Sequence, residues 1–129
     1  MANEYRTEHD SLGEVQVPCN VYYGCQTQRG LENWKISGMR EPEVFIRSYV
    51  MIKRAAAKVN SELKMLPSDK AQNIMKACDF ILKEGKFHDS FVIDVFQAGA
   101  GTSFNMNVNE VLSNLAAEIA QKPLGDYKY

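Results

Sequence analysis

Two helical patterns of apolar residues, separated by Leu66-Pro67, constrain the fold of this chain more than any other feature of its sequence. The first begins at Pro42, a residue suited to the first turn of a helix, and its apolar residues recur at four- and three-residue steps: Phe45, Tyr49, Ile52, Ala56, Val59 and Leu63. The second has Ser68 as its expected N-cap and Gly85 as its stop, with these residues facing inward: Ala71, Ile74, Met75, Cys78, Ile81 and Leu82. The sequence therefore predicts two antiparallel helices that bury both stripes in one core.

A glycine-containing loop precedes a third predicted helix, within residues 97–110. Gly99 and Gly101 let the backbone adopt left-handed dihedrals and approach a ligand closely. Thr102 and Ser103 follow, and either residue is expected to cap the helix while offering hydroxyl and amide donors. The partial positive charge at a helix start favours a carboxylate or phosphate by roughly 0.3–2 kcal/mol. The loop thus predicts a bound anion.

A structural interpretation of this loop stays open, because a Gly-x-Gly turn before a capped helix is common. Phe104 stands where the third glycine of a dinucleotide fingerprint would be, and no Gly-Lys-Ser/Thr sequence follows. Nucleotide binding is therefore not expected.

The third helix carries four asparagines, although asparagine favours caps and turns over helix interiors: Asn105, Asn107, Asn109 and Asn114. Asn105 and Asn109 share one helical face, so their amides are expected to bond a ligand or neighbouring backbone. The expected apolar face comprises Val108, Val111, Leu112, Leu115 and Ile119. Residues 122–125, which include Pro123 and Gly125, are expected to stop the helix.

The N-terminal region predicts a two-stranded ribbon in residues 5–18, where Val15 and Val17 alternate with polar neighbours and Gly13 lies near the turn. A ribbon this short cannot bury itself in water, so it must pack against helices or another subunit.

A short helix is expected in residues 24–33, with Gln26 and Arg29 on its polar face. Arg29 is a candidate for binding a carboxylate with both arms of its guanidinium group. In the alternative interpretation, Arg29 pairs with Glu32 or Glu14.

Residues 35–41 read as a loop, and residues 86–96 are apolar enough to predict a buried extended run or helical turn. His88 beside Asp89 has the composition of an oriented base, and the alternative is a cap or a surface pair.

Composition limits the class of protein. A chain of 129 residues predicts one domain, and its 15 basic and 16 acidic residues give no electrostatic reason to expect nucleic acid or an anionic membrane as partner. The sequence has neither a membrane-length apolar run nor a signal-peptide pattern, so a cytoplasmic location is expected. Cys19, Cys25 and Cys78 lack zinc-ligand spacing, which predicts buried free thiols and no metal site.

Three blocks of sequence together resemble the N-terminal domain of the aspartase/fumarase superfamily. The first runs from Arg6 through Asp10 and Gly13 to Val17-Pro18, the second from Tyr23-Gly24 to Arg29 with Glu32-Asn33, and the third from Asp94 to Glu110. The resemblance covers nearly the whole chain, and the third block is long and residue-specific.

The resemblance implies a mainly α fold, a small helical domain with a short N-terminal β-hairpin, in which residues 1–129 are a single domain of a longer chain. It implies elimination of ammonia or water from a small dicarboxylate, without a cofactor, in a homotetramer. Thr102 matches the family's substrate-binding threonine, Gly101 and Ser103 flank it, and Arg29 is a weaker substrate-binding candidate. The family's catalytic base lies in a later serine-containing loop, so these residues alone are expected to be inactive.

The substrate is expected to be aspartate, giving fumarate, because the sequence from Gly99 to Ser103 and Tyr22-Tyr23-Gly24 resemble aspartases. Residues 26–33 are at least as close to fumarases, so malate is the alternative. Two further hypotheses stay open: a purely structural helical interaction domain, and a regulatory site for a small anion.

Overall fold

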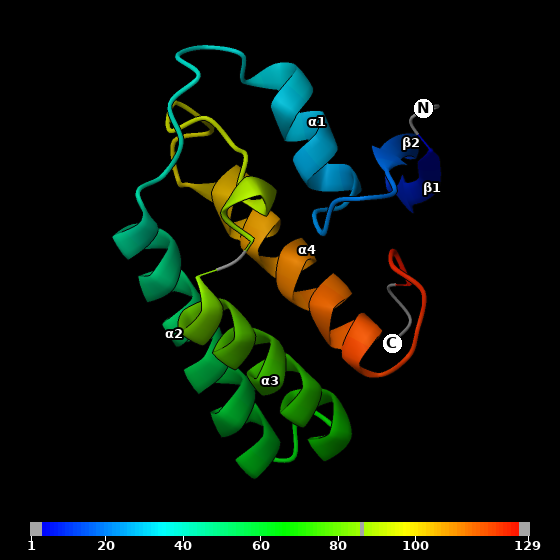
Figure 1. Cartoon of the computed structure of the whole chain (residues 1–129), viewed down its shortest axis with the longest axis vertical. Helices are drawn as coiled ribbons and strands as arrows, with labels where there is room; N and C mark the ends of the chain where they lie inside the picture. Colours follow the sequence, from blue (N-terminus) through cyan, green and yellow to red (C-terminus); the bar gives the residue numbers. More distant parts are fainter. Residues whose placement is uncertain (1–3, 86, 127–129) are drawn as a thin grey trace.

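The computed structural model describes residues 4–85 and 87–126, and within them four α-helices accompany one two-stranded antiparallel sheet (Figure 1). The elements are β1 (Tyr5–Asp10), β2 (Gly13–Pro18), α1 (Cys25–Asn33), α2 (Glu43–Glu62), α3 (Ser68–Glu84), the 3-10 turn η1 (His88–Ser90) and α4 (Thr102–Ile119). This confirms the prediction of a mainly α fold with an N-terminal β-hairpin.

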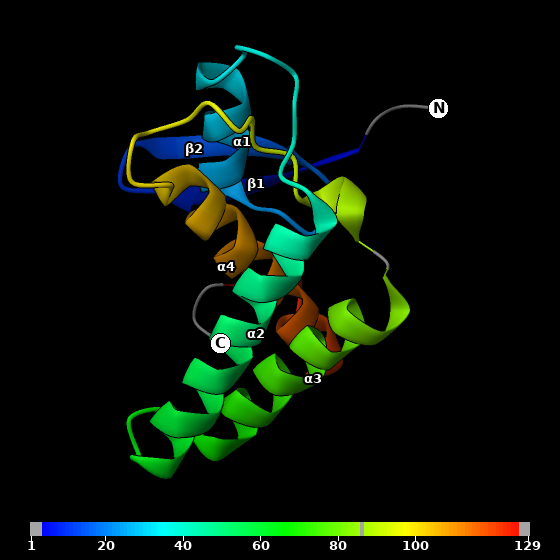
Figure 2. The same cartoon turned by 90° about the vertical axis from the view of Figure 1, so that its left-hand side faces the viewer.

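Helices α2 and α3 form an antiparallel pair, and α4 packs against it (Figure 2). Arg47 near the start of α2 donates to the carbonyl of Leu82 near the end of α3, at 2.8 Å. About two turns further along α2, Arg54 bonds Asp79 at 2.8 and 3.2 Å. These cross-links fix the register of the pair.

The predicted buried stripe of α2 is largely wrong, and only its first residues, Phe45 and Tyr49, contact the core. The residues that the helix buries are Ile46, Val50 and Ala57, while exposed fractions of 41%, 62%, 49% and 63% are found at Phe45, Ile52, Val59 and Leu63. Ala56 is exposed as well, and Tyr49 is half-buried. Helix α2 is apolar on two sides but lies at the edge of the domain, so only one side meets α3 and α4.

The expected apolar face of α3 is largely confirmed, since Ala71, Cys78 and Ile81 are buried and Ile74 and Leu82 pack partly against the core. Gly85 ends the helix in the left-handed conformation, with φ of 59°. Ser68 is not the N-cap: the helix begins at Ser68 itself, and Pro67 occupies the capping position without a side-chain bond.

Helix α4 is the centre of the core and crosses the molecule between the α2–α3 pair and α1 (Figure 1). Ile119 at its end is 39% exposed, whereas its buried apolar residues are Phe104, Val108, Val111, Leu112, Leu115, Ala116 and Ala117. Phe104 packs against Phe45 and Tyr49, with ring centroids 5.4 and 5.2 Å away.

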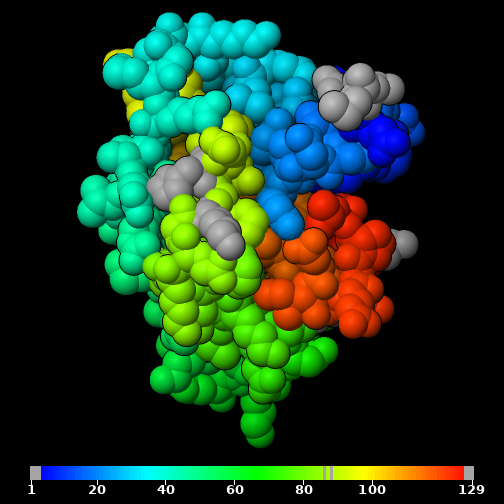
Figure 3. Space-filling model, in the orientation of Figure 1, coloured from blue at the N-terminus to red at the C-terminus, as the bar shows by residue number. Residues whose placement is uncertain are grey.

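The hairpin has Glu8 opposite Val15 and Arg6 opposite Val17, and both valines are buried against the helices. Gly13, with φ of 116°, begins β2 after the turn, as expected for this position. The chain after α4 returns to the hairpin, where a side chain at Gly125 would lie 3.0 Å from Glu8 Oε1. On the face shown in Figure 3, the hairpin and this returning segment lie side by side.

The two predicted irregular segments are confirmed and meet each other. Residues 35–41 form a loop that touches residues 87–96, the described part of the second segment, through an isolated bridge between Arg40 and Asp94. Phe91 and Ile93, 2% and 1% exposed, bury the second segment after the short η1 turn. Among the described residues, no helix has the length and apolar character needed to span a lipid bilayer.

Candidate functional site

The loop before α4 turns sharply at Gly101, whose φ of 70° lies in the left-handed region. Its amide bonds the carbonyl of Ala98 at 2.9 Å, and its carbonyl accepts from the amide of Asn105 at 3.0 Å. The side chain of Gln97 also belongs to this turn, because its Oε1 accepts from the amide of Phe104 at 2.7 Å. Gln97 was not predicted as a site residue, although an amide side chain just before a glycine turn is a possible local acceptor.

Thr102 and Ser103 do not cap α4, contrary to expectation. They are its first two residues, and Gly101 occupies the N-cap position. In residues 4–85 and 87–126, the amides of Thr102 and Ser103 have no hydrogen-bond acceptor. Two N–H groups at the start of an 18-residue helix are therefore available to a ligand.

The hydroxyl groups beside these amides are also placed for binding. Thr102 is exposed, and Ser103 Oγ accepts a hydrogen bond of 3.1 Å from Trp34 Nε1. A hydroxyl that accepts one bond still has a proton to donate. Side chains added at Gly99 or Gly101 would meet no atom within 4 Å, so there is open space next to the donors. The geometry suits an anion such as a carboxylate.

Two of the four asparagines of α4 bind backbone, but they are not the Asn105 and Asn109 pair for which a ligand or backbone bond was expected. Asn107 bonds the carbonyl of Ser90 at 2.8 Å and the amide of Val92 at 3.0 Å. Asn114 similarly bonds the carbonyl of Tyr22 at 2.8 Å and the amide of Gly125 at 2.7 Å. Both are buried, and they fasten irregular segments to the helix.

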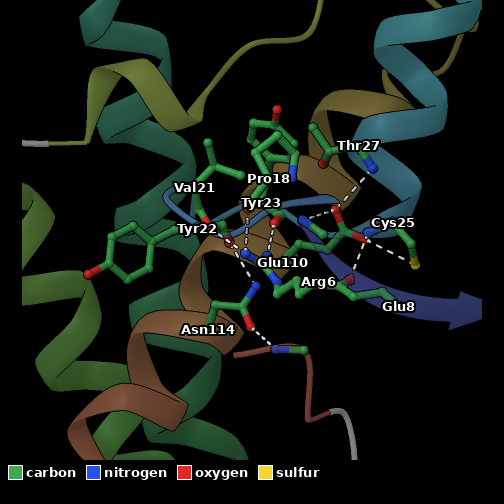
Figure 4. Close-up of polar contacts among 12 residues, drawn as sticks. Arg6, Glu8, Pro18, Val21, Tyr22, Tyr23, Cys25, Thr27, Glu110 and Asn114 are labelled. Carbon is green, nitrogen blue, oxygen red and sulfur yellow. Dashed lines mark hydrogen bonds and ion pairs between the residues drawn. The ribbon is translucent and has the colours of Figure 1, made fainter. Parts of the chain in front are cut away.

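The start of α1 is a second cluster of amides, and two buried carboxylates fill it (Figure 4). Glu110 of α4 accepts from the amides of Gly24, Gln26 and Thr27 at 2.9, 2.8 and 3.0 Å. Glu8 of β1 accepts from the amide of Cys25 at 2.8 Å. Sequence reasoning missed this cluster. The sequence feature that could have indicated it is the recurrence of the polar residues Asn107, Glu110 and Asn114 at helical spacing beside the apolar face of α4.

Arg6 completes this cluster and ties it to the chain between β2 and α1. Its Nε bonds Glu8 Oε1 at 2.8 Å, and its other nitrogens bond the carbonyls of Pro18, Val21 and Tyr23 at 2.8, 3.0 and 2.6 Å (Figure 4). The side chain of Glu8 is 1% exposed, so this is a charge pair inside the domain. Arg6 therefore holds in place the segment between β2 and α1.

Arg29 faces the hairpin turn. It bonds Asp10 at 2.8 and 3.0 Å and the carbonyl of Gly13 at 3.2 Å, so it pairs with neither Glu32 nor Glu14. The hydrogen bond from Arg29 lowers the pKa of Asp10. The structure thus brings Gly101, Thr102 and Ser103 together and directs Arg29 elsewhere.

Asp94 fills a third set of donors, most of which lie in the loop that follows α1. It accepts from the amides of Ser37, Gly38 and Phe96 at 2.7, 2.7 and 2.9 Å and from the Ser37 hydroxyl at 2.9 Å. Burial alone raises the pKa of Asp94, but these hydrogen bonds outweigh it and hold the pKa at about 2. Asp94 is therefore an ionised anchor for the loop.

The remaining candidates carry no defined chemistry. The side chain of His88 lies outside what the structure describes, and Asp89 is exposed. Cys25 and Cys78 are buried as expected, whereas Cys19 is exposed because it follows the open end of β2. Burial raises the pKa of the Cys78 thiol to about 12, which keeps it protonated. In the described part of the chain, no three His, Cys, Asp or Glu side chains are grouped to hold a metal ion.

Comparison with known proteins shows which proteins this chain resembles. A family described as "Lyase" matches residues 13–126. The chain is 47% identical over 126 residues to a class II fumarate hydratase of Halobacterium salinarum, covering 98% of this chain and 27% of that protein. It is 46% identical over 131 residues to the aspartate ammonia-lyase of Escherichia coli, covering 100% of this chain and again 27% of the relative.

Among solved structures, a fumarate lyase:delta crystallin from Brucella melitensis superimposes with a TM-score of 0.93 at 45% identity, covering 97% of this chain and 27% of that one. A class II fumarase from Schistosoma mansoni gives a TM-score of 0.89 at 37% identity, covering 95% of this chain and 26% of that one. The chain thus spans about a quarter of the length of the relatives that it matches.

Proposed function

Because this chain belongs to the lyase family that includes aspartate ammonia-lyases and class II fumarases, we propose that it is the first domain of an enzyme that eliminates a small group from a dicarboxylate. Residues 1–129 form one domain in this proposal and bind one substrate carboxylate at the start of α4. The catalytic base comes from a part of the protein outside these residues.

The observation that carries the proposal is the open start of α4. The amides of Thr102 and Ser103 have no acceptor in the described residues, and the hydroxyl of exposed Thr102 lies beside them. The left-handed Gly101 has open space next to it, so a ligand can approach the backbone. These donors form a preorganised group.

Elimination next to a carboxylate explains why such donors are useful. Removing a proton from the adjacent carbon places a second negative charge on the carboxylate, and fixed donors stabilise that charge as it develops. A hydrogen bond to a charged group contributes roughly 1.5–3 kcal/mol, so two or three donors supply a large share of the rate enhancement. Thr102, Ser103 and Gly101 are the proposed substrate-binding residues. Arg29 is a weaker candidate because Asp10 and Gly13 occupy its donors.

Aspartate is the proposed substrate, with ammonia and fumarate as products. Overall identity does not separate the two activities, since a fumarase and an aspartase match at 47% and 46%. The proposal instead rests on the sequence from Gly99 to Ser103, which resembles aspartases, whereas fumarases more usually have Gly-Ser-Gly-Thr-Gln. Malate is the alternative.

A homotetramer is part of the same proposal. The exposed apolar side of α2 supports further contacts in a larger assembly, with 71%, 53%, 62% and 63% of the side chain exposed at Val44, Met51, Ile52 and Leu63. Light scattering of the protein at its native length tests this, and a monomer at working concentration would remove the tetramer from the proposal.

The deciding experiment measures fumarate by its ultraviolet absorbance, with the native-length protein offered aspartate and malate in parallel. Fumarate from aspartate alone is the expected result, and residues 1–129 alone are expected to give none. Fumarate from malate alone would mean that Ala100 and Ser103 do not select aspartate. Fumarate from neither substrate would overturn the proposed activity.

A further inference from the structure

A cleft of about 270 Å³ lies between α2, α3 and α4, on residues that the proposed substrate site does not use. Two lysines line it, Lys53 from α2 and Lys70 from α3, together with the neutral polar side chains of Asn60, Asn109 and Ser113. The other five lining residues are aliphatic, and among the described residues that line the cleft none is acidic. We call it the lysine cleft.

Lys53 differs from the other cationic residues of α2. Arg54 bonds Asp79 at 2.8 Å, and Arg47 and Lys58 each lie 3.9 Å from a glutamate one turn away. Lys53 Nζ instead donates to the neutral Oδ1 of Asn105 at 2.7 Å, and it has no carboxylate partner within the described residues. An ammonium group has three N–H donors, so the bond to Asn105 leaves two of them for another acceptor.

The surroundings make an unpaired charge costly. Lys53 is half-buried, and a charge that leaves water is normally compensated by an opposite charge. Asn105 and Asn109 share one face of α4. Asn105 accepts the hydrogen bond from Lys53, and Asn109 lines the cleft. The asparagine face that the sequence singled out therefore borders a cationic cleft with an aliphatic lining.

From this combination we propose that the lysine cleft binds a carboxylate that carries a short aliphatic tail. The carboxylate pairs with the Lys53 ammonium group near Asn109, and the tail covers the aliphatic lining. The volume is just below the roughly 300–1,000 Å³ of pockets that hold drug-sized ligands, so the occupant is small. This site is separate from the start of α4 and does not depend on the proposed lyase activity.

The test titrates the native-length protein with hexanoate, and with hexanamide as a neutral probe of the same length, by calorimetry and amide NMR shifts. Hexanoate is expected to bind at least about tenfold more tightly than hexanamide and to shift the amide signals of Asn109 and Ser113. Equal affinity for the two probes, shifts confined to residues 99–103, or the absence of binding would each overturn the proposal. Tighter binding of succinate than of hexanoate would overturn the assigned tail.

Variants test whether the charge of Lys53 is responsible for binding hexanoate. Lys53→Met keeps the aliphatic stem and is expected to weaken hexanoate binding about tenfold or more, whereas Lys53→Arg retains it. Lys58→Met, one turn along α2 and outside the cleft, is the matched control and leaves affinity unchanged. Thr102→Val is also expected to leave it unchanged, so failure of the cleft and failure of the lyase site are distinguishable. Unaltered affinity in Lys53→Met would overturn the proposal.

Discussion

The starts of α1 and α4 present the same physical problem and solve it differently. At α1, Glu8 and Glu110 accept from four consecutive amides, those of Gly24 to Thr27, at 2.8–3.0 Å. At α4, only the amides of Phe104 and Asn105 are bonded within the described residues, and those of Thr102 and Ser103 are left open. Both helix starts favour negative charge, but only α1 receives it from the chain itself.

The difference teaches how a helix start becomes a site. Glu110 comes from the middle of α4, so the helix that leaves its own start open closes the start of its neighbour. The closed end is buried and joins three elements, whereas the open end is exposed at Thr102. A binding site can form where the first backbone amides of a helix have no acceptor within the protein, because a ligand can then accept from them.

Removing the acceptor from the closed end has the largest expected effect. Glu110→Gln keeps the shape but places an N–H₂ group against amide donors, and it is expected to lower the free energy of unfolding by about 3 kcal/mol. Urea denaturation followed by circular dichroism measures the loss. Glu118→Gln, an exposed glutamate of the same helix, is the control and is expected to change stability by less than about 0.5 kcal/mol. Equal stability of the two variants would mean that the closed end contributes little.

The open end is expected to respond in activity and not in stability. Thr102→Val removes a hydroxyl while keeping the shape, and it is expected to lower kcat/KM of the native-length protein about 100-fold or more. Its denaturation curve should overlay that of the parent. Thr7→Val, an exposed threonine on the hairpin, serves as the matched control. An unchanged rate in Thr102→Val would remove Thr102 from the site.

Converting the open end into a closed one gives a smaller change of opposite sign. Gln97→Glu places a carboxylate where Oε1 already accepts from Phe104, so stability is expected to rise by about 0.5–1 kcal/mol. The same charge repels a substrate carboxylate, so KM should rise severalfold. Gln97→Met, which removes the acceptor, is expected to lose stability instead. A lower KM in Gln97→Glu would contradict the proposed position of the substrate.

The last prediction concerns Asp94, whose amide donors lie in loops. Its folded pKa of about 2 is below the ordinary value of 3.8, so its contribution to stability is complete above pH 4 and is lost as the pH falls from about 4 to 2. Thermal unfolding across this interval is expected to show a smaller pH dependence in Asp94→Asn than in the parent. Identical slopes would show that Asp94 does not anchor the loop.

The order of the helices and strands was predictable from local signals, and so were their bounds to within a few residues, although the predicted caps of α3 and α4 were wrong. Gly85 stops α3, Pro42 precedes α2, and the alternation of Val15 and Val17 marks β2. The open donors at Thr102 and Ser103 were also predictable, because a glycine turn before a helix is encoded in adjacent residues.

Other features depend on distant neighbours and could not be predicted locally. Helix α2 has two apolar sides, and which one is buried depends on where α3 and α4 lie, so Ile52 was placed in the core although it is 62% exposed. Arg29 had acidic candidates close in sequence, but the fold presents Asp10 across the hairpin. A glutamate in a helix is usually exposed, and Glu110 is buried only because the amides at the start of α1 bond it.

The hydrogen bond between Trp34 and Ser103 has a practical consequence. Trp34 is the only tryptophan in this sequence, and its Nε1 donates to Ser103 Oγ at 3.1 Å. Its fluorescence emission therefore originates next to the open start of α4 and is sensitive to changes in polarity there. A dicarboxylate titration followed by the emission maximum reads occupancy of that position optically, without a label and without turnover.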